Sequence, residues 1–150
     1  MVLRYKQVEA ALAEVMKVKP KARGAFRARL RHLRNIGLPR LPNPGSGRAI
    51  DYSRQQALAM LVAIELEKIG QSPMQAASIA QSMVRQSPYG QFEGEDWYLY
   101  VSEHEPRYTM GRASLIEQMM KSAPAVLLLI NISACVRKLD PALDRALASG

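Results

Sequence analysis

Apolar residues recur at helical spacing through the first third of the chain. They form one apolar stripe along residues 3–16 and another along residues 20–36, and each stripe predicts an amphipathic helix. Pro20 ends the first segment, because proline cannot donate the backbone hydrogen bond that a helix interior needs. Gly37 and Pro39 follow the second segment, as is typical of a helix end. The pattern therefore predicts two consecutive helices with a short break between them.

Two further helices are predicted from matching start signals. Ser53 precedes Gln56 by three residues, and Ser72 precedes Gln75 by the same spacing. In such a capping box the two side chains each bond the backbone amide of the other residue. Gly70, which suits the left-handed turn after a helix, separates the two segments. We expect one helix on either side of it.

The pattern changes after a polar linker at residues 87–96. The segments beyond it are a strand at residues 97–103, a helix at 113–121 and a fully buried strand at 125–132. A further helix is expected to start at a Ser133 cap, and Pro141 is expected to break or kink it. The expected fold class is mainly α with a small β component. We expect a first domain at residues 1–86 and a small α+β unit at residues 87–150.

Residues 38–52 lie between the second and third predicted helices and are rich in proline and glycine. Three prolines and two glycines exclude a helix there. A Gly-Ser-Gly sequence at residues 45–47 predicts a tight tip, and residues 48–52 alternate like a short strand. Together they predict a wing, a small hairpin with Arg40 and Arg48 near its tip. The order helix, helix, wing, helix, helix is that of a winged helix-turn-helix.

Basic residues are concentrated in the first third of the sequence. Residues 1–54 hold 13 Lys and Arg against 3 Asp and Glu, whereas residues 55–150 hold 8 against 10. The net charge of +8 therefore comes entirely from the first third. Such asymmetry is typical of a nucleic-acid face, and it also fits an anionic membrane surface or a solvated basic surface.

Four arginines share one side of the second predicted helix, beside its apolar seam. At 100° per residue they fall within about 80° of one another. Guanidinium groups on one face suit phosphates and guanine edges, and no acidic residue lies between residues 20 and 50. We therefore predict that this helix and the wing bind double-stranded DNA. The residues expected to contact it are Lys17, Lys19, Lys21, Arg23, Arg27, Arg31, Arg34, Arg40, Ser46 and Arg48.

Enzyme, metal and membrane functions are not predicted. His32 and His104 lie far apart, and the Glu-His-Glu sequence at residues 103–105 fits a solvated turn better than a metal site. Cys135 fits a small core residue, and a single cysteine forms no disulfide within the chain. No apolar stretch is long enough for a bilayer, and aromatic residues are too sparse among the basic ones to favour single-stranded RNA. We expect no cofactor and no membrane partner.

A family resemblance rests on three features. Ile36-Gly37-Leu38 forms a helix stop, residues 48–53 read Arg-Ala-Ile-Asp-Tyr-Ser, and a leucine-rich helix follows. In these features residues 26–73 resemble the winged helix-turn-helix of the MerR family. Residues 31–34 depart from the family's Arg-Tyr-Tyr-Glu phrase, and its long dimerising coiled coil has no counterpart. The whole chain is more similar to the MerR-like activators of prophages and gene transfer agents.

The resemblance and the charge pattern imply a sequence-specific regulator of transcription, an activator on the cytoplasmic nucleoid. The second helix would enter the major groove, and the wing would hold the flanking backbone. RNA polymerase and a second copy of the chain are the expected protein partners. The residues expected to form the dimer are Leu128, Ile130, Val136, Leu139 and Leu143. The alternative is a phage or mobile-element adaptor that binds RNA polymerase or another protein and contacts DNA only non-specifically.

Overall fold

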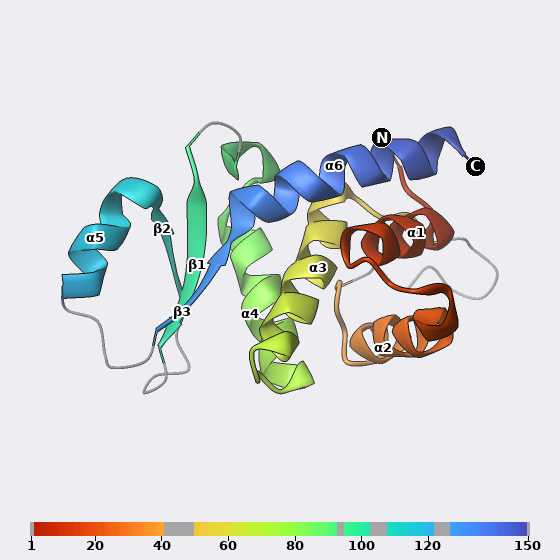
Figure 1. Cartoon of the computed structure of the whole chain (residues 1–150), viewed down its shortest axis with the longest axis horizontal. Coiled ribbons are helices and arrows are strands. Elements are labelled where there is room, and N and C mark those ends of the chain that lie inside the picture. Colours follow the sequence, from red (N-terminus) through yellow and green to blue (C-terminus); the bar gives the residue numbers. More distant parts are fainter. Residues whose placement is uncertain (1, 41–49, 93–94, 103–107, 122–126, 150) are drawn as a thin grey trace.

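The first half of the chain is helical, as its periodicity predicts. The computed structural model describes residues 2–40, 50–92, 95–102, 108–121 and 127–149. Its elements up to residue 86 are α1 (Tyr5–Val15), a 3-10 turn η1 (Pro20–Ala22), α2 (Arg23–Asn35), α3 (Arg54–Lys68) and α4 (Pro73–Gln86) (Figure 1). The predicted helices on both sides of Pro20 and of Gly70 are confirmed.

The predicted capping signals fix the ends of α3 and α4. Ser53 Oγ accepts a hydrogen bond from the amide of Gln56 at 3.1 Å, and Ser72 Oγ accepts one from Gln75 at 3.3 Å. Gly70 follows α3 with a φ of +96°, where its amide donates to the Glu67 carbonyl at 3.1 Å. A residue without Cβ adopts this backbone conformation at little cost. Local sequence therefore determines where these helices begin and end.

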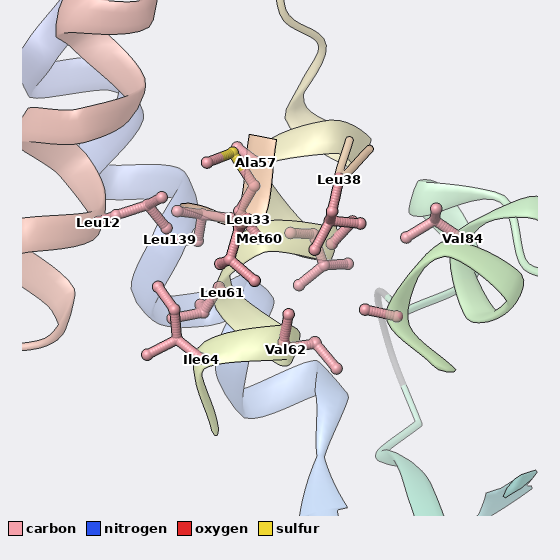
Figure 2. Close-up of a cluster of buried hydrophobic side chains, with 14 of the residues drawn as sticks. Leu12, Leu33, Leu38, Ala57, Met60, Leu61, Val62, Ile64, Val84 and Leu139 are labelled. Carbon is pink, nitrogen blue, oxygen red and sulfur yellow. The ribbon is translucent and has the colours of Figure 1, made fainter. Parts of the chain in front are cut away.

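Helix α3 lies at the centre of the apolar core. Every residue from Ala57 to Ile64 is at most 1% exposed. This full burial arises because α1, α4 and α6 (Ile132–Ala148) all contact α3. Figure 2 shows Leu12 of α1, Val84 of α4 and Leu139 of α6 around the side chains of α3. A helix that is apolar on all sides needs such neighbours on all sides.

The second half adds a small antiparallel sheet with strand order β2-β1-β3. The elements of the second half before α6 are η2 (Tyr89–Phe92), β1 (Trp97–Ser102), β2 (Tyr108–Arg112), α5 (Ala113–Lys121) and β3 (Leu127–Asn131). The fold class, mainly α with a small β component, is confirmed. Strand β2 was not predicted, because its Tyr-Thr-Met-Gly-Arg sequence shows no clear alternation and contains a glycine.

The strand predicted at residues 125–132 is confirmed over Leu127–Asn131, and residues 125–126 lie outside the described chain, but the prediction that the strand is fully buried is wrong. Strand β3 lies at the edge of the sheet and pairs with β1, and Ile132 already belongs to α6. Ile130 faces the core at 9% exposure, whereas Leu129 on the other face is 41% exposed. Successive side chains of a strand point to opposite faces, so an apolar run is fully buried only where both faces are covered.

Helix α6 connects the sheet with the helical half, running from β3 to α1 along one side of the molecule (Figure 1). The predicted cap at Ser133 is wrong: Asn131 Oδ1 accepts from the amide of Ala134 at 2.7 Å, and Ser133 Oγ instead accepts from the Trp97 amide at 3.0 Å. Pro141 lies inside the continuous helix and is exposed to solvent. Water can therefore reach the carbonyl that loses its helical partner, so the proline does not break α6.

The predicted wing falls largely on residues 41–49, which lie outside the described residues. Of its flanks, Tyr52 forms an isolated antiparallel bridge with Leu3, with amide–carbonyl distances of 2.8 and 3.0 Å in the two directions. The predicted domain boundary after residue 86 coincides with the end of α4, and α6 crosses it to contact α1 and α3.

Within the described ranges, each helix is too short or too polar to cross a lipid bilayer.

Candidate nucleic-acid interface

Helix α2 is attached to the protein by one narrow seam. Phe26, Leu30 and Leu33 are buried, while most of its other side chains are exposed. The seam repeats every three to four residues, which places it on a single side of the helix. The other sides of α2 therefore carry its arginines at the surface.

Two of the four predicted DNA-binding arginines are engaged with α1. The Arg27 Nε donates to Glu9 Oε1 at 2.9 Å and to Oε2 at 3.1 Å, and a terminal nitrogen forms an ion pair with Oε1 at 2.8 Å. This carboxylate raises the pKa of Arg27 above its ordinary value. The Arg34 guanidinium lies 4.7 Å from the centre of the Tyr5 ring, a cation–π contact. Periodicity places Arg27 and Arg34 within about 20° of each other around α2, and this part of the helix surface lies next to α1.

Arg34 also lies in a partly buried aromatic cluster with Tyr5 and Tyr52. The two tyrosine rings are 6.1 Å apart, and burial raises the pKa of both phenols. Among the described residues, the buried Arg34 Nε and Tyr52 hydroxyl have no hydrogen-bond partner. Arg34 therefore acts in this structure as a link between α2, α1 and the segment after the predicted wing.

A fifth arginine, Arg29, attaches α2 to α3. Its Nε donates to Glu67 Oε2 at 2.8 Å, and a terminal nitrogen donates to the Ile64 carbonyl at 3.2 Å. Sequence reasoning did not single out this residue, because Glu67 lies 38 positions away and no local signal pairs the two. The bond orients α2 on the core and leaves its outer side uncovered.

The remaining predicted basic residues are exposed. Arg23 and Arg31 of α2 make no hydrogen bond or ion pair within the described parts of the chain, and the same holds for the lysine side chains before it. Apart from Arg27, the predicted DNA-binding residues that the structure shows as exposed are Lys17, Lys19, Lys21, Arg23, Arg31 and Arg40. The backbone amide of Arg40 donates to Gln81 Oε1 at 2.9 Å. We call these six residues the basic face.

Small residues extend the exposed side of α2 next to Arg31. Gly24 and Ala28 are exposed, and the space where a Cβ of Gly24 would lie contains no atom within 4 Å. At 100° per residue both lie within about 60° of Arg31 around the helix. The helix backbone can therefore approach a partner closely at this side. Sequence reasoning did not predict this surface for close approach. The side of α2 that faces solvent becomes known only when the elements that pack against its apolar seam are known.

The amino-terminal end of α2 adds positive potential. Ala22 occupies the N-cap position with no side-chain hydrogen bond, and the first turn contains no acidic residue. The peptide dipoles of the helix place a partial positive charge at this end, next to Lys21 and Arg23. Backbone and side chains thus attract anions at the same end of the helix.

Other predicted site residues lie elsewhere or outside the described chain. Ser46 and Arg48 belong to the segment at 41–49 that the structure does not describe. The apolar residues predicted for a dimer are mostly buried inside the chain itself. Ile130, Val136, Leu139 and Leu143 are at most 9% exposed, and Leu128 is half-buried. Their apolar area stabilises the packing of α6 and β3 against the rest of the chain.

The other chemically notable residues form no centre of their own in the described parts of the chain. Burial raises the pKa of Cys135 to about 11, which makes its thiol a weak nucleophile at neutral pH. No group of three or more metal-ligating side chains occurs among the described residues. His104 and its two glutamates lie outside them.

Comparison with known proteins assigns no family. The chain matches no protein-family model, and no curated protein is significantly similar to it in sequence. The function is therefore argued from the basic face.

Proposed function

We propose that this protein is a sequence-specific, double-stranded-DNA-binding regulator of transcription, an activator of the MerR-like winged helix-turn-helix kind. The observation that carries the proposal is the basic face, six exposed cations on and beside α2. Acidic residues near it are already engaged: Glu9 bonds Arg27, and Glu67 bonds Arg29. The face is thus left with unneutralised positive charge, as a phosphate-binding surface requires.

Helix α2 is the proposed recognition helix. Its outer side carries Arg31 next to Gly24 and Ala28, so the backbone can come close to base edges in the major groove. Lys17, Lys19 and Lys21 would bind phosphates, which supply affinity and register but no sequence information. The segment from Arg40 through Ser46 to Arg48 is the proposed wing. Arg27 and Arg34, which contact α1, would position the recognition helix.

Salt dependence tests the electrostatic part of the proposal. If the face neutralises roughly six phosphates, the logarithm of the affinity for duplex DNA should fall with the logarithm of salt concentration at a slope near −5. The affinity is measured by fluorescence anisotropy on duplexes selected from a random pool. An affinity for duplex DNA that does not change with salt would contradict the proposal.

A pair of charge-matched double variants tests the location of the site. R23A/R31A removes two cations from the basic face, and K121A/K138A removes two exposed cations from α5 and α6. We expect R23A/R31A to weaken binding by about tenfold or more and to reduce the salt slope by about 2, because two phosphate or base contacts are lost. K121A/K138A should bind nearly as the wild type does. Equal losses in the two variants would mean that net charge alone attracts DNA.

A second candidate function is favoured by exposed apolar side chains at the sheet end of the molecule. Leu115 and Met120 of α5 and Leu129 of β3 are 48%, 59% and 41% exposed. They support an adaptor whose main contact is RNA polymerase or another protein, or a dimer formed at this end. If the R23A/R31A variant still functions like the wild type in cells, the adaptor function is favoured over that of a DNA-binding regulator.

A further inference from the structure

We propose that a pocket between the end of α1 and the start of α2 binds an acidic peptide segment through one bulky apolar side chain. The pocket has a volume of about 410 Å³ and is open to solvent. Lys17, Lys19 and Lys21 lie at its exposed rim together with Ala25, and Val18 and Phe26 line its less exposed part. Among the described residues, none that lines the pocket is acidic.

The chemistry of the pocket selects this class of partner. A cationic rim around an apolar floor complements a ligand that is anionic outside and apolar at its centre. DNA sugar and phosphate groups gain nothing from an apolar floor, since protein–DNA interfaces are more polar than protein–protein interfaces. A small apolar anion would remain largely in water, because the pocket is open and enclosed ligand sites bury most of their ligand. A side chain presented by a peptide suits an open pocket of this size.

The backbone at Lys17 supplies an independent observation. Helices α1, α2 and α3 end in the same way: the second residue after the C-cap donates its amide to a carbonyl in the last turn, at 2.9 Å for Val18 and Leu38 and 3.0 Å for Gln71. The residue before each donor has positive φ. That residue is glycine in α2 and α3, Gly37 and Gly70, but it is Lys17, at φ +52°, in α1.

A lysine in this conformation is unfavourable compared with glycine. The lysine ammonium makes no hydrogen bond or ion pair within the described chain that would compensate for it. Its side chain instead lies at the rim of the pocket. A strained residue at a surface site is the expected result where its side chain is needed for binding.

Arg29 keeps the pocket in shape. It lines the pocket, and its bonds to Glu67 and to the Ile64 carbonyl fix its guanidinium. The Glu67 carboxylate is thereby paired with a cation and repels an acidic ligand less. The proposed binding of a peptide in this pocket does not depend on the proposed binding of DNA. It does share its lysines with the basic face, so a bound acidic peptide would exclude DNA phosphates from them.

The binding test uses the whole chain without DNA and a fluorescein-labelled peptide, Ac-EDEDWEDED-NH2, in fluorescence anisotropy. Two control peptides replace the tryptophan by glycine or all acids by Gln and Asn. We expect each control to bind at least about tenfold more weakly, because one lacks the apolar anchor and the other lacks the charge. Equal binding of the tryptophan and glycine peptides would overturn the proposal, since charge alone would then account for it.

Variants locate the peptide on the pocket. Ala25→Leu fills it from an exposed helix position and should abolish the advantage of the tryptophan peptide over the glycine peptide. Ala28→Leu, one turn further along α2 and outside the pocket, is the matched control and should keep that advantage. Loss of the advantage in both variants, or in neither, would overturn the placement.

Lys17→Gly separates binding from folding. We expect this variant to unfold at the wild-type temperature or above it, because glycine relieves the backbone conformation, and to bind the peptide about threefold more weakly, because one exposed charge is lost. Wild-type affinity in K17G would show that the lysine has no role in binding. Failure of DNA binding leaves these outcomes unchanged, because no DNA is present.

Discussion

Helices α2 and α3 follow one another in the chain and are similar in length, but α3 is largely buried whereas most of α2 is exposed. In α3, eight consecutive residues from Ala57 to Ile64 are buried, whereas in α2 the buried residues are Phe26, Leu30 and Leu33. The free energy of folding therefore depends strongly on α3 and on only one side of α2. The rest of α2 is free to carry charge that contributes little to stability. Most stabilising residues of this pair thus lie on α3, and the proposed binding residues lie on the exposed side of α2.

The largest expected effect is a core truncation in α3. Leu61→Ala removes a side chain that is 1% exposed, between α3 and its neighbouring helices. We expect a loss of about 3 kcal/mol in the free energy of unfolding, because a cavity remains as well as lost apolar burial. Urea denaturation followed by circular dichroism measures it. A loss below about 1 kcal/mol would mean that α3 is less central than its burial indicates.

The link between the two helices should have an intermediate effect. Arg29→Ala leaves Glu67, whose Oε1 already lacks a hydrogen-bond partner among the described residues, without its cation. We expect a loss of about 1–2 kcal/mol, since a partly buried carboxylate loses its charged donor. Glu67→Gln in the same background should recover part of it. An unchanged stability of R29A would show that the seam alone attaches α2.

The start of α3 should contribute less. Ser53→Ala removes the acceptor for the Gln56 amide at 3.1 Å, and we expect a loss of about 1 kcal/mol. Ser78→Ala, an exposed position inside α4, is the control and should not destabilise the protein, because alanine is the better helix former there. Thermal denaturation of both variants measures the difference. Equal melting temperatures would mean that packing alone fixes the start of α3.

The smallest expected effect on stability is on the outer side of α2. Arg31→Ala should change the free energy of unfolding by less than about 0.5 kcal/mol, because the side chain is exposed and makes no bond within the described chain. The same variant should weaken duplex DNA binding several-fold by the proposal above. Urea denaturation and DNA anisotropy on one preparation check both. If R31A is destabilised, the exposed charge of α2 does contribute to stability, and the proposed contrast between the two helices is wrong.

The sequence predicted the parts of this structure that depend on local signals. Capping boxes located α3 and α4, and periodicity identified the seam of α2 and the side on which its arginines lie. It did not show that α1 lies against that side, where Glu9 bonds Arg27 and Tyr5 contacts Arg34. Such pairs depend on the packing of segments that are distant in sequence. The same limit applies to β3, because its run of apolar residues does not show that one face of the strand is exposed to solvent.

Helix α6 has a consequence for how the protein is made. It contacts α1 extensively, and Arg145 forms an ion pair with Glu14, although these residues are separated by 131 positions. At usual rates of translation, the ribosome makes α6 on the order of ten seconds after it has made α1. During that time the apolar side of α1 lacks the helix that covers it in the folded structure. The basic face, which begins at Lys17 just after α1, thus follows a helix whose covering partner is made only with residues 132–148.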